Sequence, residues 1–192
     1  MSNGRGSVHS PTSEFHAFFE RCHAELARLA HLLLGDSDEA DDLAADAFVV
    51  IWNQWDRVRT AEHPLAYARG VVTNLARSHV RSRVRERRRI ALFWTRHQEP
   101  ADGPDVPAVL DVREALARLP FRRRACVVLR HAFDVSERET ARVLGISTGT
   151  VKSQTSRGMA ELARLLTPTE QDAARSVETV LALRGGKTGR YT

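Results

Sequence analysis

Residues 134–166 read DVSERETARVLGISTGTVKSQTSRGMAELARLL, and this stretch decides the fold of the second half of the chain. Ser136 and Glu139 have the spacing of a capping box, so a short helix should begin here. Ala141, Gly145 and Val151 then follow at offsets of zero, four and ten residues. This combination predicts a helix-turn-helix.

Each of the three spaced positions meets a physical requirement of that motif. Ala141 is small where the two helices approach closely, Gly145 can adopt the positive φ of the turn, and Val151 fills the angle between the helices. A plain helical hairpin with a glycine turn is the alternative, but it does not explain the capping box and the basic second helix together. We therefore interpret the segment as a DNA-binding module.

The second helix of the motif is expected from about Thr148 to Leu165. Its exposed face should carry side chains that reach phosphates or base edges in a major groove. These candidate DNA-binding residues are Thr148, Thr150, Lys152, Ser153, Gln154, Ser156 and Arg157.

Helical periodicity also runs through the rest of the chain, and strand alternation is not found. Apolar residues from Phe15 to Leu33 recur at steps of four and three, and Gly35 should end that helix. Asp36 or Ser37 can cap a second helix that extends to about Trp55, and a third should start near Pro64. The pattern predicts an all-α fold.

The sequence QEPADGPDVP at 98–107 contains three prolines and three acids, and this composition is typical of a linker. It divides the chain into two expected helical domains, residues 14–97 and residues 108–166. Residues 1–13 and 167–192 are expected to be flexible tails.

Charge is distributed unevenly along the 192 residues, whose net charge is +5. The region 14–76 sums to −6, whereas 77–97 sums to +7 because it holds eight arginines and one glutamate. The second domain sums to +5. This pattern indicates more than one kind of partner, at least one of which is a polyanion.

Two further stretches of the first domain suggest binding surfaces. Asp38, Asp42 and Asp46 are four residues apart, so they share one helix face, which we interpret as a docking face for a basic protein. The arginine run follows Trp52 and Tyr67, an arrangement suited to holding unpaired bases, although tryptophans at helical spacing more often belong to a core.

Catalytic and metal-binding motifs are not found, so no cofactor and no enzymatic activity are expected. The cysteines, Cys22 and Cys126, match neither a disulfide framework nor a CxxC site. The chain also contains neither a signal-peptide core nor an apolar run long enough to cross a membrane, so a cytoplasmic protein is expected.

Taken together, these segments resemble the extracytoplasmic-function (ECF) sigma factors, the small two-domain initiation subunits of bacterial RNA polymerase. EADDLAADAFVVIWNQWDRV (39–58) is similar to the family's polymerase-binding helix, and HPLAYARGVVTNLARSHVRSRVRERR (63–88) to its minus-10 recognition segment. The second domain is similar to the family's minus-35 reader. The order of these segments along the chain points to this family more specifically than any one segment does.

The resemblance implies roles for individual residues. Asp42, Asp46, Phe48 and Trp52 would contact the clamp helices of the polymerase β′ subunit. Asn74, Arg77 and Arg81 would hold the minus-10 DNA, and the helix-turn-helix would hold the minus-35 box beside the β flap. Core RNA polymerase and promoter DNA are the implied partners, and an anti-sigma factor is a plausible third. A conventional helix-turn-helix regulator remains the alternative, although it does not explain the acidic and arginine-rich helices.

Overall fold

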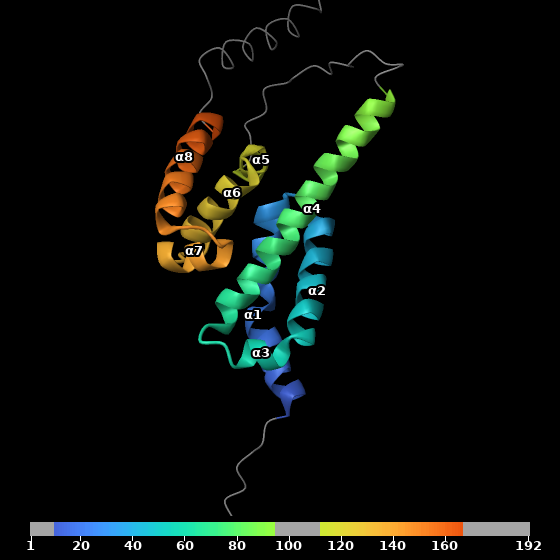
Figure 1. Ribbon diagram of the computed structural model, residues 1–192, viewed down its shortest axis with the longest axis vertical. Helices are drawn as coiled ribbons and strands as arrows, with labels where there is room; N and C mark the ends of the chain where they lie inside the picture. Colours follow the sequence, from blue (N-terminus) through green and yellow to red (C-terminus); the bar gives the residue numbers. More distant parts are fainter. Residues whose placement is uncertain (1–9, 95–111, 167–192) are drawn as a thin grey trace, which may run out of the picture.

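The computed structural model describes residues 10–94 and 112–166, and these residues are helical throughout, with turns but no strands between the helices (Figure 1). The expected all-α fold is confirmed. The linker and the tail 167–192 lie outside the described residues, as do residues 1–9. The elements in chain order are α1 Pro11–Leu34, α2 Ser37–Asn53, α3 Trp55–Arg59, α4 Pro64–Trp94, α5 Val112–Arg118, α6 Phe121–Val127, the π-helical turn η1 Val128–Ala132, α7 Glu137–Leu144 and α8 Thr148–Leu166.

The helix ends follow local sequence signals closely. Gly35 has φ +83° and its N–H donates to the carbonyl of His31 at 2.9 Å, which ends α1. The side chain of Asp36 accepts a hydrogen bond of 3.2 Å from the N–H of Glu39 and so caps α2. At the other end, α1 begins at Pro11, so residues 11–13 of the expected tail are helical.

In the first half of the chain, α1, α2 and α4 pack against one another, and the short α3 closes one end (Figure 1). Leu26, Leu29 and Leu33 of the expected α1 stripe are fully buried. Phe18 is buried as well, whereas Phe15 and Phe19 are half-buried at the edge of the core. The buried face of α1 is therefore shifted slightly around the helix from the expected one: it includes Phe18, while Phe15 and Phe19 lie at its edge.

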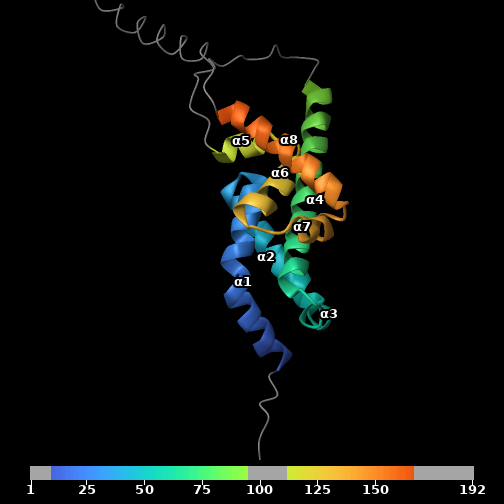
Figure 2. The same cartoon turned by 90° about the vertical axis from the view of Figure 1, so that its left-hand side faces the viewer.

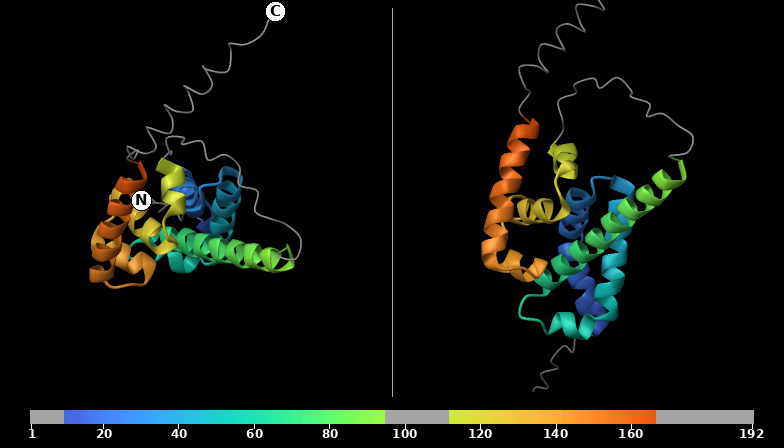
Figure 3. Two further views of the ribbon diagram at one scale, coloured as in Figure 1. Left: turned by 90° about the horizontal axis from the view of Figure 1, so that it is seen from above. Right: turned by 45° about the horizontal axis from the view of Figure 1, so that its top comes forward.

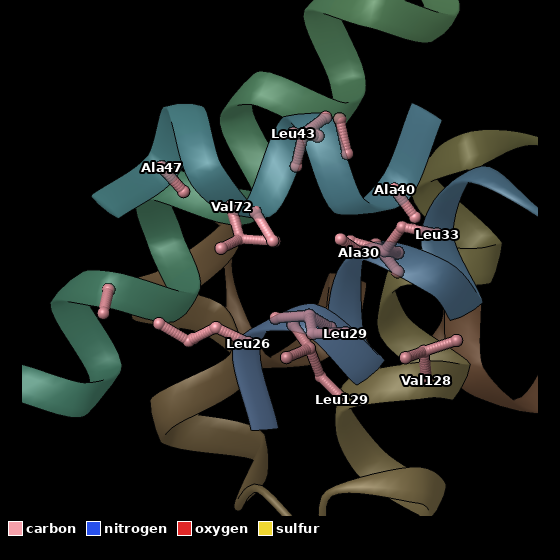
Figure 4. Close-up of a cluster of buried hydrophobic side chains, with 14 of the residues drawn as sticks. Leu26, Leu29, Ala30, Leu33, Ala40, Leu43, Ala47, Val72, Val128 and Leu129 are labelled. Atoms are coloured by element: carbon pink, nitrogen blue, oxygen red, sulfur yellow. The ribbon is translucent and has the colours of Figure 1, made fainter. Parts of the chain in front are cut away.

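The two halves of the chain share one continuous core. Leu29 and Leu33 of α1 lie beside Val128 and Leu129 of the second half, and all four are buried (Figure 4). The second half, α5 to α8, packs against α1 and α4. It lies on the side opposite α2, as the views in Figures 1, 2 and 3 agree. The two expected domains are thus in close contact.

None of the helices in the described ranges is both long enough and apolar enough to cross a lipid bilayer.

Candidate nucleic-acid interface

The helix-turn-helix is formed by α7 and α8. Ser136 Oγ accepts a hydrogen bond of 3.2 Å from the N–H of Glu139, which starts α7, and Gly145 adopts φ +63° in the turn. Val151 is fully buried and Ala141 nearly so. The expected scaffold of Ala141, Gly145 and Val151 therefore has the geometry that its spacing predicts.

The helix α8 presents one polar face to solvent. Its first turn is capped by Ser147, whose Oγ accepts from the N–H of Thr150 at 3.1 Å. Of the candidate DNA-binding residues, Thr150 and Gln154 are half-buried, and the exposed ones are Thr148, Lys152, Ser153, Ser156 and Arg157. An exposed polar face with two cations suits phosphate and base-edge contacts.

Gly158 has a packing role that was not predicted from the sequence. It is buried on the α8 side that meets α6, and a Cβ atom built there would lie 2.6 Å from Cγ2 of Val127. Glycine allows the close approach that keeps the opposite face of α8 turned outward. A glycine in the middle of an expected helix is the signal that could have indicated this contact.

A cleft of about 400 Å³, lined by both apolar and polar residues, lies beside Asn74 on α4. It is bounded by the connection between α3 and α4, by the first turns of α4, and on the far side by α7. Its lining includes His63, Tyr67, Asn74, Arg142 and Val143. An amide, an imidazole and an aromatic ring around one space can hydrogen-bond and stack a nucleobase.

The candidate minus-10 residues follow one face of α4. Arg77 and Arg81 are exposed, and Arg77 Nη2 donates a hydrogen bond of 3.2 Å to Asn74 Oδ1. Other arginines of the run are paired within the protein: Arg83 bonds Glu39 at 2.5 Å and Arg89 bonds Glu86 at 2.5 Å. The run is one basic stretch in the sequence, but in the structure its arginines divide into exposed ones, such as Arg77 and Arg81, and ones paired within the protein.

The acidic face is formed by Asp38, Asp42 and Asp46 of α2, all exposed. Among the described residues, no ion pair involves any of the three. Their acidic neighbours, by contrast, are paired: Glu39 with Arg83 and His79, and Asp41 with His31 at 3.1 Å. The unpaired carboxylates therefore concentrate on one face.

The two aromatic candidates on α2, Trp52 and Phe48, differ in how far they are exposed to solvent. Trp52 is 42% exposed and lies edge-on to Phe15, with ring centroids 4.8 Å apart. Phe48 is only 6% exposed, because it packs against Phe19 and His23. The expectation that Phe48 contacts a partner directly is therefore corrected. The side chain belongs to the core and supports the surface from beneath.

Neither cysteine side chain is accessible at the surface of the described structure. Both are free and buried. Burial raises the pKa of the Cys22 thiol, and it raises the pKa of Cys126 to about 11. Both thiols are therefore protonated near neutral pH. No group of three or more metal-ligating side chains occurs among the residues described.

Two family models match separate parts of the chain. Residues 18–86 match the family model of sigma-70 region 2, and residues 110–162 match that of sigma-70 region 4. The ECF RNA polymerase sigma factor SigM of Mycobacterium tuberculosis is 35% identical over 157 residues, which cover 79% of this chain and 76% of SigM. The RNA polymerase sigma-E factor of Streptomyces coelicolor is 31% identical, with 83% and 90% covered.

Solved structures of the same fold include the sigma factor RpoE of Bartonella quintana in complex with the anti-sigma factor NepR. It is 25% identical, with a TM-score of 0.61, and the match covers 80% of this chain and 96% of that one. The structure of CnrH in complex with the cytosolic domain of CnrY, 24% identical, shares the fold with a TM-score of 0.59 and coverage of 81% and 88%.

The chain belongs to the ECF family of bacterial RNA polymerase sigma factors. It is a transcription initiation factor that directs RNA polymerase to promoters. The alternative of a conventional helix-turn-helix regulator is not favoured, because sigma-70 region 2 occupies the first half of the chain.

Proposed function

We propose that this factor acts through three separate surfaces, by binding alone and without bond chemistry of its own. The acidic face of α2 would bind polymerase, the cleft beside Asn74 would capture unpaired minus-10 bases, and α8 would read the minus-35 box. One observation carries this proposal: α2 and α8 lie on opposite sides of the molecule (Figures 1 and 3), so polymerase and duplex DNA can be bound at once.

For the polymerase surface, we propose Asp42 and Asp46, with Trp52 at its edge, as the contacts to the β′ clamp helices. These carboxylates are exposed and form no ion pair with the residues that the structure describes, so they are available to a basic partner. The exposed indole of Trp52 adds apolar area that a partner can bury. Phe48 would act only by holding this helix face in position.

For the minus-10 surface, we propose that Asn74 binds a base drawn out of the stack, while Arg77 and Arg81 hold the phosphate backbone. The cleft beside Asn74 supports this assignment because its lining includes His63 and Tyr67, which together with Asn74 can hydrogen-bond and stack a nucleobase. Binding the base would offset an unpairing cost of a few kcal/mol.

For the minus-35 surface, we propose the exposed face of α8, with Lys152 and Arg157 as its two cations. Ser153 and Ser156 lie between them on the same face. The half-buried Gln154 and Thr150, and Thr148 in the first turn, would complete the contact with the groove and backbone.

A further protein contact is proposed for the second domain. An apolar groove of about 450 Å³ is formed by α1, α5, η1 and α8, and its lining includes Leu32, Val112, Leu116, Met159 and Leu162. Val112 and Met159 are 52% and 41% exposed. Exposed apolar surface of this kind indicates a protein partner. We propose that an anti-sigma factor covers it, and that the β flap contacts the same domain in the polymerase complex.

We propose that the two domains have separate tasks. Residues 14–97 would bind polymerase and the minus-10 DNA, and residues 108–166 would bind the minus-35 box. Since both partners are found in the bacterial cytoplasm, we expect the factor to act there.

Purified core polymerase provides the test. The chain should copurify with core, and the two together should produce discrete transcript starts on fragments of the source genome that core alone does not produce. If the chain binds DNA but neither copurifies with core nor yields new starts, the proposed function is wrong.

A further inference from the structure

The apolar groove formed by α1, α5, η1 and α8 reaches the end of α8. Three of its lining residues, Met159, Leu162 and Leu166, recur at steps of three and four, so they share one face of that helix. Leu166 is also the last residue of α8. Residues 167–192 therefore leave the helix at the edge of the groove.

The lining of the groove suits the apolar face of a helix. Apart from Arg28 and His131, which are both exposed, its lining residues are apolar. Val112 at the start of α5 and Met159 on α8 are 52% and 41% exposed, so the described residues leave part of the apolar lining uncovered. A groove of this kind is typically filled by an amphipathic helix.

The sequence that follows α8 carries the signals of such a helix. Residues 167–184, which lie outside the described residues, read TPTEQDAARSVETVLALR. Pro168 disfavours helical geometry at Thr167, in agreement with the observed end of α8. Thr167 and Glu170 have the spacing of a capping box with a proline at the first helical position, and Gly185 can end the new helix.

The apolar stripe of this sequence matches the groove in length. Its members fall on one helix face at steps of three and four, and it spans about 12 Å along the axis. The groove face of α8, from Met159 to Leu166, spans about 10 Å. The stripe residues are Ala173, Val177, Val180 and Leu181.

We propose that residues 168–184 form a helix that packs into the groove in the free factor, antiparallel to α8, with Val177 beside Leu162 and Val180 beside Met159. A short turn after Leu166 is enough for this arrangement, as in other helical hairpins. The tether holds the segment at an effective concentration in the millimolar range, which favours it over a free partner. The anti-sigma factor proposed for this groove therefore has to displace the chain's own segment.

Cross-linking in the full chain tests the packing directly. Met159→Cys is combined with Val180→Cys, and the matched control combines Met159→Cys with Ala182→Cys, which points about 200° away around the expected helix. Under mild oxidation the first pair should form an intramolecular disulfide roughly tenfold faster, because the Cα atoms must come within about 7 Å. The native thiols are buried with a raised pKa, so they react slowly.

Maleimide labelling of the single variant Met159→Cys tests whether the segment covers the groove. Adding Val180→Asp places a carboxylate against the apolar lining and should uncover the new thiol. If the segment covers it for about nine-tenths of the time, the labelling rate should rise about tenfold. Ala182→Asp, which adds the same charge on the opposite face, should leave the rate unchanged. Deleting residues 167–192 should match Val180→Asp, with circular dichroism showing that α1 to α8 stay folded.

Two results would overturn this inference: equal cross-linking of the two cysteine pairs, or an unchanged labelling rate after residues 167–192 are removed. Disulfides between chains in place of disulfides within one chain would also overturn it, because the occupant would then be a second copy. Neither measurement uses polymerase, DNA or an anti-sigma factor. Failure here would therefore leave the proposed function standing, and failure of that function would leave this packing standing.

Discussion

The Nη1 atom of Arg124 in α6 donates a hydrogen bond of 2.5 Å to the carbonyl oxygen of Leu33, near the end of α1. That carbonyl is among the last four of its helix and has no partner within α1. The same guanidinium donates to the carbonyls of Ala117 and Leu119, at 2.6 and 3.2 Å. Burial lowers the pKa of Arg124. One buried cation therefore fastens α1 to the segment around α5.

We expect Arg124→Met to lower the free energy of unfolding by about 2–4 kcal/mol, because three carbonyls, two of them in buried hydrogen bonds, lose a charged donor. The control is Arg122→Met, an exposed position on the same helix, for which the change should stay within about 0.5 kcal/mol. Urea unfolding followed by circular dichroism measures both. Equal midpoints for the two variants would contradict the role of Arg124.

Gly158→Ala tests the contact between α6 and α8. The new Cβ would lie 2.6 Å from Val127 Cγ2, so the helices must shift or Val127 must change rotamer, at a cost of about 1–3 kcal/mol. Gly149→Ala in the same helix is the matched control, since its Cβ meets only Ser147 Oγ at 4.0 Å. Higher helix propensity should make that variant neutral or more stable.

Adding Val127→Ala to Gly158→Ala should restore part of the lost stability, because it removes the methyl group that clashes. Thermal or urea unfolding of the single and double variants checks this. If the two substitutions simply add their costs, the contact is not the cause of the destabilisation.

Asp42→Arg combined with Asp46→Arg should abolish binding to core polymerase, because it reverses the charge of the acidic face. The control, Glu20→Arg with Glu137→Arg, changes the net charge equally at exposed positions on α1 and α7. Pull-down with purified core measures binding, and a promoter found with the wild-type factor shows whether transcription follows. Wild-type levels of core binding by the Asp42/Asp46 variant would refute the docking assignment.

Lys152 and Arg157 should differ in what they contribute to DNA recognition. They are five residues apart on α8, so they point about 140° apart around the helix axis. We expect Arg157 to pair with a guanine and Lys152, near the helix start, to contact phosphate. A bidentate arginine–guanine contact is worth about 1–3 kcal/mol of discrimination.

Lys152→Ala should then weaken binding to all sequences similarly and reduce the salt dependence by roughly one counterion. Arg157→Ala should relax preference at one base pair. Affinities for the minus-35 box and its single-base variants, at two salt concentrations, separate the two effects. If both variants lose affinity in the same sequence-independent way, this division of roles is wrong.

Much of the local structure could be predicted from the sequence, because the hydrogen bonds that form helix caps and turns join residues only a few positions apart. Gly35 and Gly145 end α1 and α7 at positive φ. Asp36 caps the start of α2, and Ser136 caps the start of α7. Helical periodicity identified the apolar faces, and the fixed spacing of Ala141, Gly145 and Val151 identified the helix-turn-helix. The order of acidic, arginine-rich and helix-turn-helix segments indicated the family.

The tertiary structure alone decided which surfaces cover one another. Periodicity says that a helix face is apolar, but it does not say which other helix covers that face. It therefore could not show that Phe48 is buried beneath the surface that carries Trp52, or that Arg124 reaches back to α1. Glu139 illustrates the physical reason: its spacing fits a local cap, and Arg69, brought near by the fold, provides a full opposite charge 3.0 Å away.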